Sequence, residues 1–466
     1  MPNFSEGRNK KVIDEITAVI QNTRGIKLLD VEMGFSTNRT VVTFAGEPEC
    51  VVEAAFRAIE KAASLIDMRF HKGEHPRIGS TDVCPFVPIK GISLEEAISL
   101  SIELAKKVGE ELGIPVYLYE FSARTPERKS LANIRAGEYE SLPEKLQDPH
   151  WKPDFGPSVF NENVAKTGAT VIGVRKILIA YNINLNTRSR RLATAIANDL
   201  REKGRPLKHP DPISGSQIKN HEGDDIHIPG KFPGIRAIGW FIDEYQRCQV
   251  SINVSDYEKT PLHAIYEATK EAAEKRGVRV TGSEIVGLVP EKALIDTGIF
   301  YLKEQKRGRA LPPEDIINIA VNSLGLSELQ PFTPQKRIIE YLLEEENKKT
   351  FLNDTLKNFI YEVMREKSVP GGGSVSALLL NLSIALSCMV TNLSCDKRGY
   401  ENKYTTLDEI AEKLSTLIRE TLPLTDRDAL NFTEAMNLMK SDQQSALRKL
   451  LEVPLKIIEI ADELLP

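Results

Sequence analysis

In the first two thirds of the chain, hydrophobic residues have the spacing of helices in some segments and the pattern of strands in others. The order of these segments occurs twice. In the first copy, residues 9–21 and 48–68 place apolar side chains three and four positions apart, which predicts two helices. Residues 26–31 and 40–44 are short, apolar and rich in β-branched side chains, which predicts two strands between these helices.

The second copy is more complete and begins with a predicted strand at residues 176–185. A helix, two strands, a second helix and a last strand follow, at residues 190–203, 235–242, 248–254, 260–275 and 278–281. This order is typical of a ferredoxin-like βαββαβ unit. The first copy matches only from its helix onward, because Asn3 aligns with the end of the second copy's opening strand. We therefore expect the opening strand of the first copy to be missing, and Met1 not to be the natural start of a fully active protein.

The last third has helical spacing throughout, which predicts an all-α bundle. Residues 344–352 begin with a charged stretch and are the expected linker. Beyond an amphipathic helix at residues 356–363, three further helices are expected at residues 404–422, 426–439 and 443–465.

One apolar stretch in this region is long enough to be a membrane span. No charged residue occurs between Ser368 and Cys395, and residues 375–390 are mostly apolar. Polar residues recur inside the stretch, at Asn381 and Ser383 for example, and three glycines precede it. These features favour a helix buried in the bundle over a helix in lipid.

Together these patterns predict an α/β (α+β) fold followed by an all-α domain. The expected domains are residues 1–174 and 175–343, which form two ferredoxin-like subdomains, a linker at 344–352, and a helical domain at 353–466.

Composition narrows the class of protein. The chain has 466 residues, of which 41% are hydrophobic and 27% charged, as in ordinary globular proteins. Its net charge of −5 provides no basic field for nucleic acid. The first residues, MPNFSEGRNKK, lack the apolar core of a signal peptide, and the five cysteines form no dense pattern. A reducing, cytoplasmic setting is the expectation.

Residues 71–86, HKGEHPRIGSTDVCPF, are the densest group of acid and base side chains in the chain. His71 and His75 lie four positions apart, as in a zinc-binding helix, but Gly73 and Pro76 disfavour a helix through both. A solvated polar loop and a proton-transfer centre remain as alternatives.

Seven segments bear on the choice between a solvated polar loop and a proton-transfer centre. They are PNFSEG (2–7), STNRT (36–40), HKGEHPRIGSTDVCPF (71–86), IRAGEYE (134–140), PDFGPS (153–158), GLVP (287–290) and PGGGSV (370–375). In this order they resemble the signatures of the formimidoyltransferase-cyclodeaminase family, along nearly the whole chain.

The resemblance implies a two-sheet formiminotransferase domain that transfers a formimidoyl group between N-formimidoyl-L-glutamate and tetrahydrofolate, a reaction of histidine degradation and one-carbon metabolism. A group that accepts and returns a proton is needed, and the family assigns this role to the histidine that matches His75. Arg39 or Arg77 is expected to bind the glutamate carboxylates, with Asn38 in the same binding set. Asp82 is expected to orient His75 or to contact the pterin.

The remaining expected folate or substrate contacts also follow from the resemblance. Residues 156–168 match the folate-binding segment, from which Gly156, Pro157, Ser158 and Gly168 are carried over. Glu284 lies where relatives carry Gln or Glu near the substrate.

The last third is similar to the cyclodeaminase domain, which releases ammonia and forms 5,10-methenyltetrahydrofolate. Asp428, the second acid of DRDALNF, matches the catalytic acid. The family's final helices are not present by residue 466, so we expect an incomplete bundle with impaired cyclodeaminase activity.

Two alternatives to this function stay open. The first is a related folate formyltransferase or formyl-folate cycloligase, and the second is a folate-binding or assembly protein without activity. The expected partners are N-formimidoyl-L-glutamate, L-glutamate and folates, with or without polyglutamate tails, and further copies of the chain in a dimer or larger homo-oligomer. Tetrahydrofolate is expected as substrate and carrier, without a metal, a nucleic acid or a membrane span.

Overall fold

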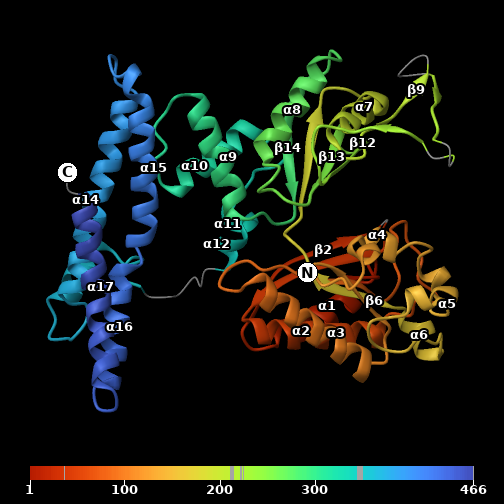
Figure 1. Cartoon of the computed structure of the whole chain (residues 1–466), viewed down its shortest axis with the longest axis horizontal. Helices are drawn as coiled ribbons and strands as arrows, with labels where there is room; N and C mark the ends of the chain where they lie inside the picture. The colour runs from red at the N-terminus through yellow and green to blue at the C-terminus, as the bar shows by residue number, and fades with distance from the viewer. Residues whose placement is uncertain (36, 210–214, 221–222, 224, 344–349, 465–466) are drawn as a thin grey trace. The chain divides into compact units, whose positions relative to one another are not determined.

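The computed structural model describes residues 1–35, 37–209, 215–220, 223, 225–343 and 350–464 (Figure 1). Internal contacts divide the chain into two compact units. Unit 1 consists of residues 1–260, 268–290 and 333–343, and unit 2 of the described residues within 261–267, 291–332 and 344–466. Most of the expected linker lies outside the described residues, and the expected domain boundaries stay predictions.

Unit 1 contains a six-stranded sheet with the order β2-β3-β1-β4-β6-β5. Its strands are β1 (Asn3–Phe4), β2 (Ile26–Gly34), β3 (Arg39–Gly46), β4 (Thr81–Phe86), β5 (Val116–Glu120) and β6 (Thr170–Val174). The first four strands are antiparallel neighbours in the ferredoxin-like order, and β5 and β6 extend the sheet in parallel beyond β4.

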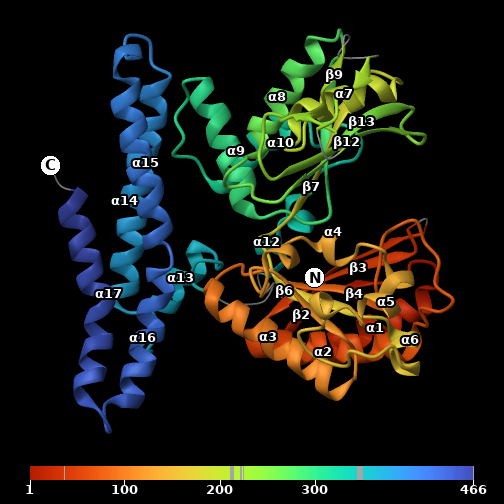
Figure 2. The same ribbon diagram turned by 45° about the vertical axis from the view of Figure 1, so that its right-hand side comes forward.

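Three helices cover one face of this sheet (Figure 2). They are α1 (Lys10–Gln21), α2 (Pro48–Leu65) and α3 (Leu94–Glu111). Ser93 and Glu96 form the capping box that begins α3, because each side chain accepts a hydrogen bond from the other residue's backbone N–H.

The expectation that the opening strand is missing was wrong. Asn3 and Phe4 form β1, which lies between β3 and β4 and pairs with both. The backbone of Pro2 and Ser5 continues these contacts, through hydrogen bonds to Val42 and Ser80. Two residues are too few to carry an alternating pattern, so the strand is defined by its partners and not by its own sequence.

Short helices follow β5 and lie around the edge of this sheet. They are α4 (Leu131–Ile134), α5 (Leu142–Lys145) and α6 (Glu162–Thr167), with 3₁₀ turns at Pro126–Lys129, Tyr139–Ser141 and Pro149–Trp151.

A second, four-stranded sheet in unit 1 has the order β12-β13-β7-β14, which is again ferredoxin-like. The strands are β7 (Ile179–Leu185), β12 (Ile235–Ile242), β13 (Arg247–Val254) and β14 (Val280–Val286), and the helices in the chain order are α7 (Arg190–Leu200) and α8 (Leu262–Glu274). The described residues between α7 and β12 include the two-residue strands β8 (Arg205–Pro206), β9 (Lys208–His209), β10 (Ser216–Gln217) and β11 (His227–Ile228). The expectation of two ferredoxin-like subdomains is confirmed.

Two short helices, α11 (Pro334–Arg337) and α12 (Ile339–Leu343), also belong to unit 1. All elements among the described residues of unit 2 are helical, as the spacing of the last third predicts. They are α9 (Glu291–Glu304), α10 (Pro313–Leu324), α13 (Leu356–Val363), α14 (Gly372–Cys395), α15 (Tyr404–Thr421), α16 (Leu424–Leu438) and α17 (Gln443–Leu464), with a 3₁₀ turn at Glu401–Lys403.

The apolar helix α14 is buried on one side only. Its buried side includes Ala377, Leu380 and Ile384, which pack in the helical unit, whereas Leu386 and Leu393 are exposed. By length and composition α14 qualifies as a possible membrane span, with a mean hydropathy of 1.8 over a window that is 33% buried. The core helices of soluble proteins can have the same length and composition, so these two properties of α14 fit a core helix as well as a membrane span. The expected burial holds for one face.

A pair of phenylalanines tests the role of β1 in the first core. Phe4 is 0% exposed within that core and Phe70 is 79% exposed. We expect Phe4→Ala to lower the free energy of unfolding of this subdomain by about 3–5 kcal/mol, since it leaves a cavity. Phe70→Ala should change the same quantity by about 0.5 kcal/mol or less. Urea titration followed by circular dichroism measures both, and equal effects would show that β1 is not part of the core.

Candidate active site

Asn38 joins three segments that are distant in the sequence. Its side-chain Oδ1 accepts a hydrogen bond from the N–H of Gly7 (3.0 Å), and its Nδ2 donates to the carbonyl of Lys72 (3.0 Å). The backbone of Asn38 has a φ of 46°, in the left-handed region that asparagine tolerates. Gly73 lies so close that an added Cβ would be 2.3 Å from the carbonyl oxygen of Thr37. The loop at residues 71–80 is therefore held against the β2–β3 turn.

His71 uses both ring nitrogens in contacts with the protein. Its Nε2–H donates to the carbonyl of Asn38 (2.9 Å), and its Nδ1 accepts from Nε of Arg77 (3.2 Å). Because a guanidinium only donates, this arrangement describes a neutral imidazole in a defined tautomer. Neither nitrogen of His71 is open to a ligand in this geometry.

Arg77 is buried and paired with two carboxylates. Its two terminal nitrogens donate to the two oxygens of Glu140 (2.9 and 2.7 Å), and Nη1 also donates to Glu138 (2.7 Å). The N–H of Tyr139 donates to the carbonyl of Arg77 (2.9 Å). This bidentate arrangement fixes segment 134–140 against the loop and occupies the fork that was a candidate for substrate carboxylates.

His75 has a different environment from His71. Its Nδ1–H donates to the carbonyl of Pro76 (2.7 Å), and its Nε2 lies 2.6 Å from Nη1 of Arg39. Nε2 must be the acceptor in the second contact. Both His75 and Arg39 are partly exposed. His75 is thus a neutral imidazole whose Nε2 lone pair points at a single cationic side chain that solvent can reach.

Asp82 is fully buried behind this pair. Its carboxylate accepts from the N–H of Ile78 (3.1 Å) and from two nitrogens of Arg135, with which it forms an ion pair. A buried carboxylate needs such partners, because an isolated one would pay a large desolvation cost. The contacts place Asp82 as a support for the loop that carries His75.

The pKa values of both histidines are lowered. Burial is the main cause for His75, followed by the positive charges of Arg39 and Arg135, and together they lower the pKa of His75 from 6.5 to about 4. Asp82 acts in the opposite direction and raises this pKa. Burial likewise lowers the pKa of His71, and the charge of Arg77 adds to the effect. Both rings are therefore neutral near pH 7.

The four expected residues of segment 156–168 lie in two places. Gly168 forms a β-bridge with Gly79, so this end of the segment touches the loop that carries His75. Gly156 lies instead against the turn before β5, where an added Cβ would be 2.3 Å from the carbonyl oxygen of Ile114. Pro157 and Ser158 follow it and are partly exposed.

Glu284 lies on β14 in the second sheet. Its Oε1 accepts from Nδ2 of Asn182 (3.0 Å) and from Nε2 of Gln249 (2.9 Å), which also donates to Asn184 (2.8 Å). These amides are buried although they belong to a sheet face. They hold one carboxylate oxygen of Glu284 in a defined position.

Asp428 lies on α16 in unit 2, and its carboxylate contacts the start of α14. Its Oδ2 accepts from the N–H of Ser374 (2.9 Å) and from the hydroxyl of the same residue (3.3 Å). A Cβ on Gly373 would be 2.0 Å from Oδ1 of Asp428, so glycine is required for this approach. The two motifs PGGGSV and DRDALNF therefore meet in space.

Comparisons with known proteins agree along the whole chain. Family models match residues 1–175 (Formiminotransferase domain, N-terminal subdomain), 180–344 (Formiminotransferase domain) and 355–466 (Formiminotransferase-cyclodeaminase). The chain is 43% identical to the Formimidoyltransferase-cyclodeaminase of Mus musculus over 480 residues, which cover 100% of this chain and 84% of the relative. The chain belongs to the formimidoyltransferase-cyclodeaminase family.

Two further relatives show how the similarity is distributed. The Formimidoyltransferase-cyclodeaminase of Dictyostelium discoideum is 38% identical, over 99% of this chain and 83% of its own. The Glutamate formimidoyltransferase of Thermoplasma acidophilum is 42% identical over 305 residues, which are 65% of this chain and 91% of the relative. Members of the family thus occur with and without a counterpart of the helical domain.

Sequence reasoning missed several residues that shape the family's site in this chain. Arg135, Glu138 and Glu140 lie in IRAGEYE, which served only to support the resemblance. Their alternating charges were a signal, but their partners 53 to 63 positions away in the chain were not visible. Ser374 was likewise quoted only as part of PGGGSV.

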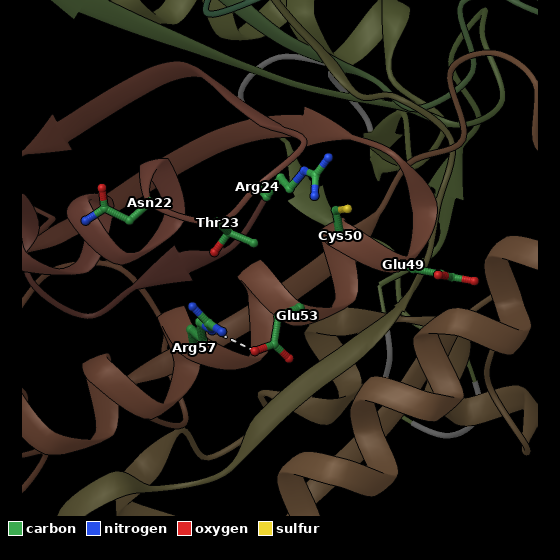
Figure 3. A pocket seen from close by; sticks show the side chains of 7 residues that line it. All are labelled: Asn22, Thr23, Arg24, Glu49, Cys50, Glu53 and Arg57. Carbon is green, nitrogen blue, oxygen red and sulfur yellow. Dashed lines mark hydrogen bonds and ion pairs between the residues drawn. The ribbon is translucent and has the colours of Figure 1, made fainter.

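Other features of the chain lie apart from these residues. A hollow of about 430 Å³ opens at the ends of α1 and α2, where Glu53 and Arg57 form an ion pair (Figure 3). None of the predicted site residues lines it. Among the residues that the structure describes, no group of three or more His, Cys, Asp or Glu side chains is arranged to hold a metal ion. The expected lack of a metal stays a prediction.

The Arg39–His75 contact predicts a titration that can be measured. Because Arg39 is a positive charge that opposes protonation, Arg39→Gln should raise the pKa of His75 from about 4 towards 6.5. NMR of histidine-labelled protein gives the titration midpoint, and His75→Gln identifies the signal. An unchanged midpoint in Arg39→Gln would show that the contact is not formed in solution.

Proposed function

We propose that this protein transfers the formimidoyl group between N-formimidoyl-L-glutamate and tetrahydrofolate, which serves as substrate and carrier. Family membership supports the reaction, and the relatives named Glutamate formimidoyltransferase support this half of it in particular. The single observation that carries the proposal is the neutral imidazole of His75, with Nδ1 held by a carbonyl and Nε2 bonded to the partly exposed Arg39.

The reaction needs a group that accepts a proton and then returns it. N5 of tetrahydrofolate attacks the amidine carbon, and the attacking nitrogen loses its proton to Nε2 of His75. The bond between the amidine carbon and the glutamate nitrogen then breaks, and the same proton goes to the departing amine. The Nδ1–H bond to the carbonyl of Pro76 fixes the tautomer that this sequence requires and stabilises the imidazolium formed midway.

Arg39 is the residue we assign to a substrate carboxylate. A carboxylate is a stronger partner for a guanidinium than a neutral imidazole. Substrate binding would therefore draw Arg39 away from Nε2 and partly neutralise its charge. Both changes raise the pKa of His75 from its low resting value, so binding itself would prepare the base.

The other expected residues receive supporting or binding roles. Arg77 is committed to Glu138 and Glu140, and we propose that it positions His71 and the loop instead of binding substrate. Asn38 and Asp82 would act in the same way, through the backbone and through Arg135. Gly156, Pro157, Ser158, Gly168 and Glu284 remain proposed folate or substrate contacts.

Removal of the base gives a direct test. We expect His75→Ala to reduce turnover of N-formimidoyl-L-glutamate with tetrahydrofolate by at least about 100-fold, with folate binding retained. The matched variant His150→Ala removes an exposed histidine of the same subdomain and should leave turnover unchanged. Substrate depletion measured by chromatography reports both, and full turnover in His75→Ala would refute the assignment.

The donor distinguishes the alternatives to this reaction. Preference for N-formyl-L-glutamate over N-formimidoyl-L-glutamate would identify a folate formyltransferase or cycloligase. Folate binding without turnover of either donor would identify a binding or assembly protein.

A second reaction, cyclodeamination, is supported by the contact between Asp428 and Ser374. Ring closure removes the proton from N10 of the folate, and the departing nitrogen must gain a proton to leave as ammonia. One carboxylate can accept the first proton and donate it in the second step. The N–H and hydroxyl of Ser374 hold the carboxylate of Asp428 in a defined position.

Asp428→Asn should abolish ammonia release from 5-formimidoyltetrahydrofolate and leave the transfer reaction intact, since a neutral amide cannot take up the proton. Asp426→Asn is the matched control, because its amide oxygen can still accept from the N–H of Phe351. Formation of 5,10-methenyltetrahydrofolate is followed by its absorbance. Equal rates in wild type and Asp428→Asn would remove Asp428 from the mechanism.

Assembly and location are part of the same proposal. A homo-oligomer, a dimer or larger, would bury exposed apolar side chains of α14 such as Leu386 and Leu393. We place the protein in the cytoplasm, where its folate substrates would be reduced.

A further inference from the structure

A cavity of about 930 Å³ lies in the second ferredoxin-like subdomain, apart from every residue assigned above. It is lined by one side of α7, by β8 and β9, and by the chain just after α8. Cavities of this volume hold small organic ligands. The lining residues are Ser189, Arg190, Arg191, Leu192, Thr194, Ala195, Asn198, Asp199, Arg205, Pro206, Lys208 and Arg276.

The packing of α7 explains why this side of the helix is free. Ala193, Ile196 and Ala197 are buried on the opposite side. A Cβ added to Gly239 of β12 would be 2.1 Å from the backbone nitrogen of Thr194, so helix and strand are in close contact. The cavity side of α7 is therefore oriented by the sheet behind it and does not depend on a ligand.

The lining carries an excess of positive charge. Arg276 is paired with Asp199 (2.6 Å), which is the one acidic residue among the described residues of the lining. Within the described part of the chain, no hydrogen bond or ion pair engages the guanidinium groups of Arg190, Arg191 and Arg205. Unpaired like charges around one cavity repel each other, and an anion in the cavity would relieve this repulsion.

Asn198 adds a second and independent observation. Its side-chain Oδ1 is buried and has no hydrogen-bond partner. A buried acceptor without a partner is costly, and a ligand that donates a hydrogen bond would satisfy it. Asn198 and Arg191 are seven residues apart on α7, so they lie on the same side of the helix.

We propose that this cavity binds a small organic polyanion that carries at least two carboxylate or phosphate groups and one hydrogen-bond donor. Guanidinium groups match both kinds of anion through two parallel hydrogen bonds. Arg190, Arg191 and Arg205 bind the anionic groups, and Asn198 accepts from the donor. The site is independent of the proposed transfer reaction.

Isothermal titration calorimetry of the full chain at low ionic strength tests the proposal with citrate and tripolyphosphate, which separate carboxylate from phosphate ligands. We expect at least one of them to bind, and Arg191→Ala and Arg205→Ala each to weaken that binding about tenfold. Arg188→Ala removes an exposed arginine next to α7 that does not line the cavity, and it should have no effect. Thermal melting of the variants, together with the more conservative substitution Arg205→Gln, excludes a loss of fold as the cause of the weaker binding.

Tricarballylate, which is citrate without its hydroxyl group, tests Asn198. Citrate should bind about threefold or more tightly than tricarballylate, and Asn198→Ala should remove the difference. Equal binding of the two would overturn the role of Asn198. Failure of both citrate and tripolyphosphate to bind, or an equal loss in Arg188→Ala, would overturn the site.

Discussion

The hydrogen bonds of Asn38 are the constraint on which the candidate active site depends. Through its side chain and its carbonyl, this residue connects Gly7 with Lys72 and His71, so that three separate segments, its own included, meet. The loop at residues 71–80 has no regular secondary structure of its own that would hold it. Its conformation is therefore imposed by backbone groups that find their partners in Asn38 and by the Arg77 carboxylate pairs behind it.

The same set of contacts separates the two histidines. His71 is enclosed between a carbonyl and a guanidinium, whereas His75 keeps one nitrogen at a partly exposed arginine. Burial and positive charge keep the ring of His75 neutral at rest. A substrate carboxylate that pairs with Arg39 would offset the effect of the positive charge. Substrate binding would thereby raise the pKa of His75. A proton shuttle can thus start from a pKa well below neutrality.

Much of this arrangement could be predicted from the sequence. The parts that could not be predicted have one cause in common. Helix and strand spacing predicted both ferredoxin-like units, because these signals are local. The two-residue strand β1 and the one-sided burial of α14 were not predicted, because each depends on neighbours from elsewhere in the chain. Motif resemblance identified His75 but gave no reason to prefer Arg39 over Arg77.

The sequence by itself determined the fold class, the family and the segments that carry chemistry. Only the tertiary structure decided which charged side chains are already paired. Arg77 and Arg39 are equivalent as sequence letters, but the carboxylates of Glu138 and Glu140 pair with the first and an imidazole contacts the second. The same holds for Arg190, Arg191 and Arg205, whose guanidinium groups have no partner among the described residues once the sheet has oriented α7. Pairing depends on distance and burial, and neither quantity is encoded in a local pattern.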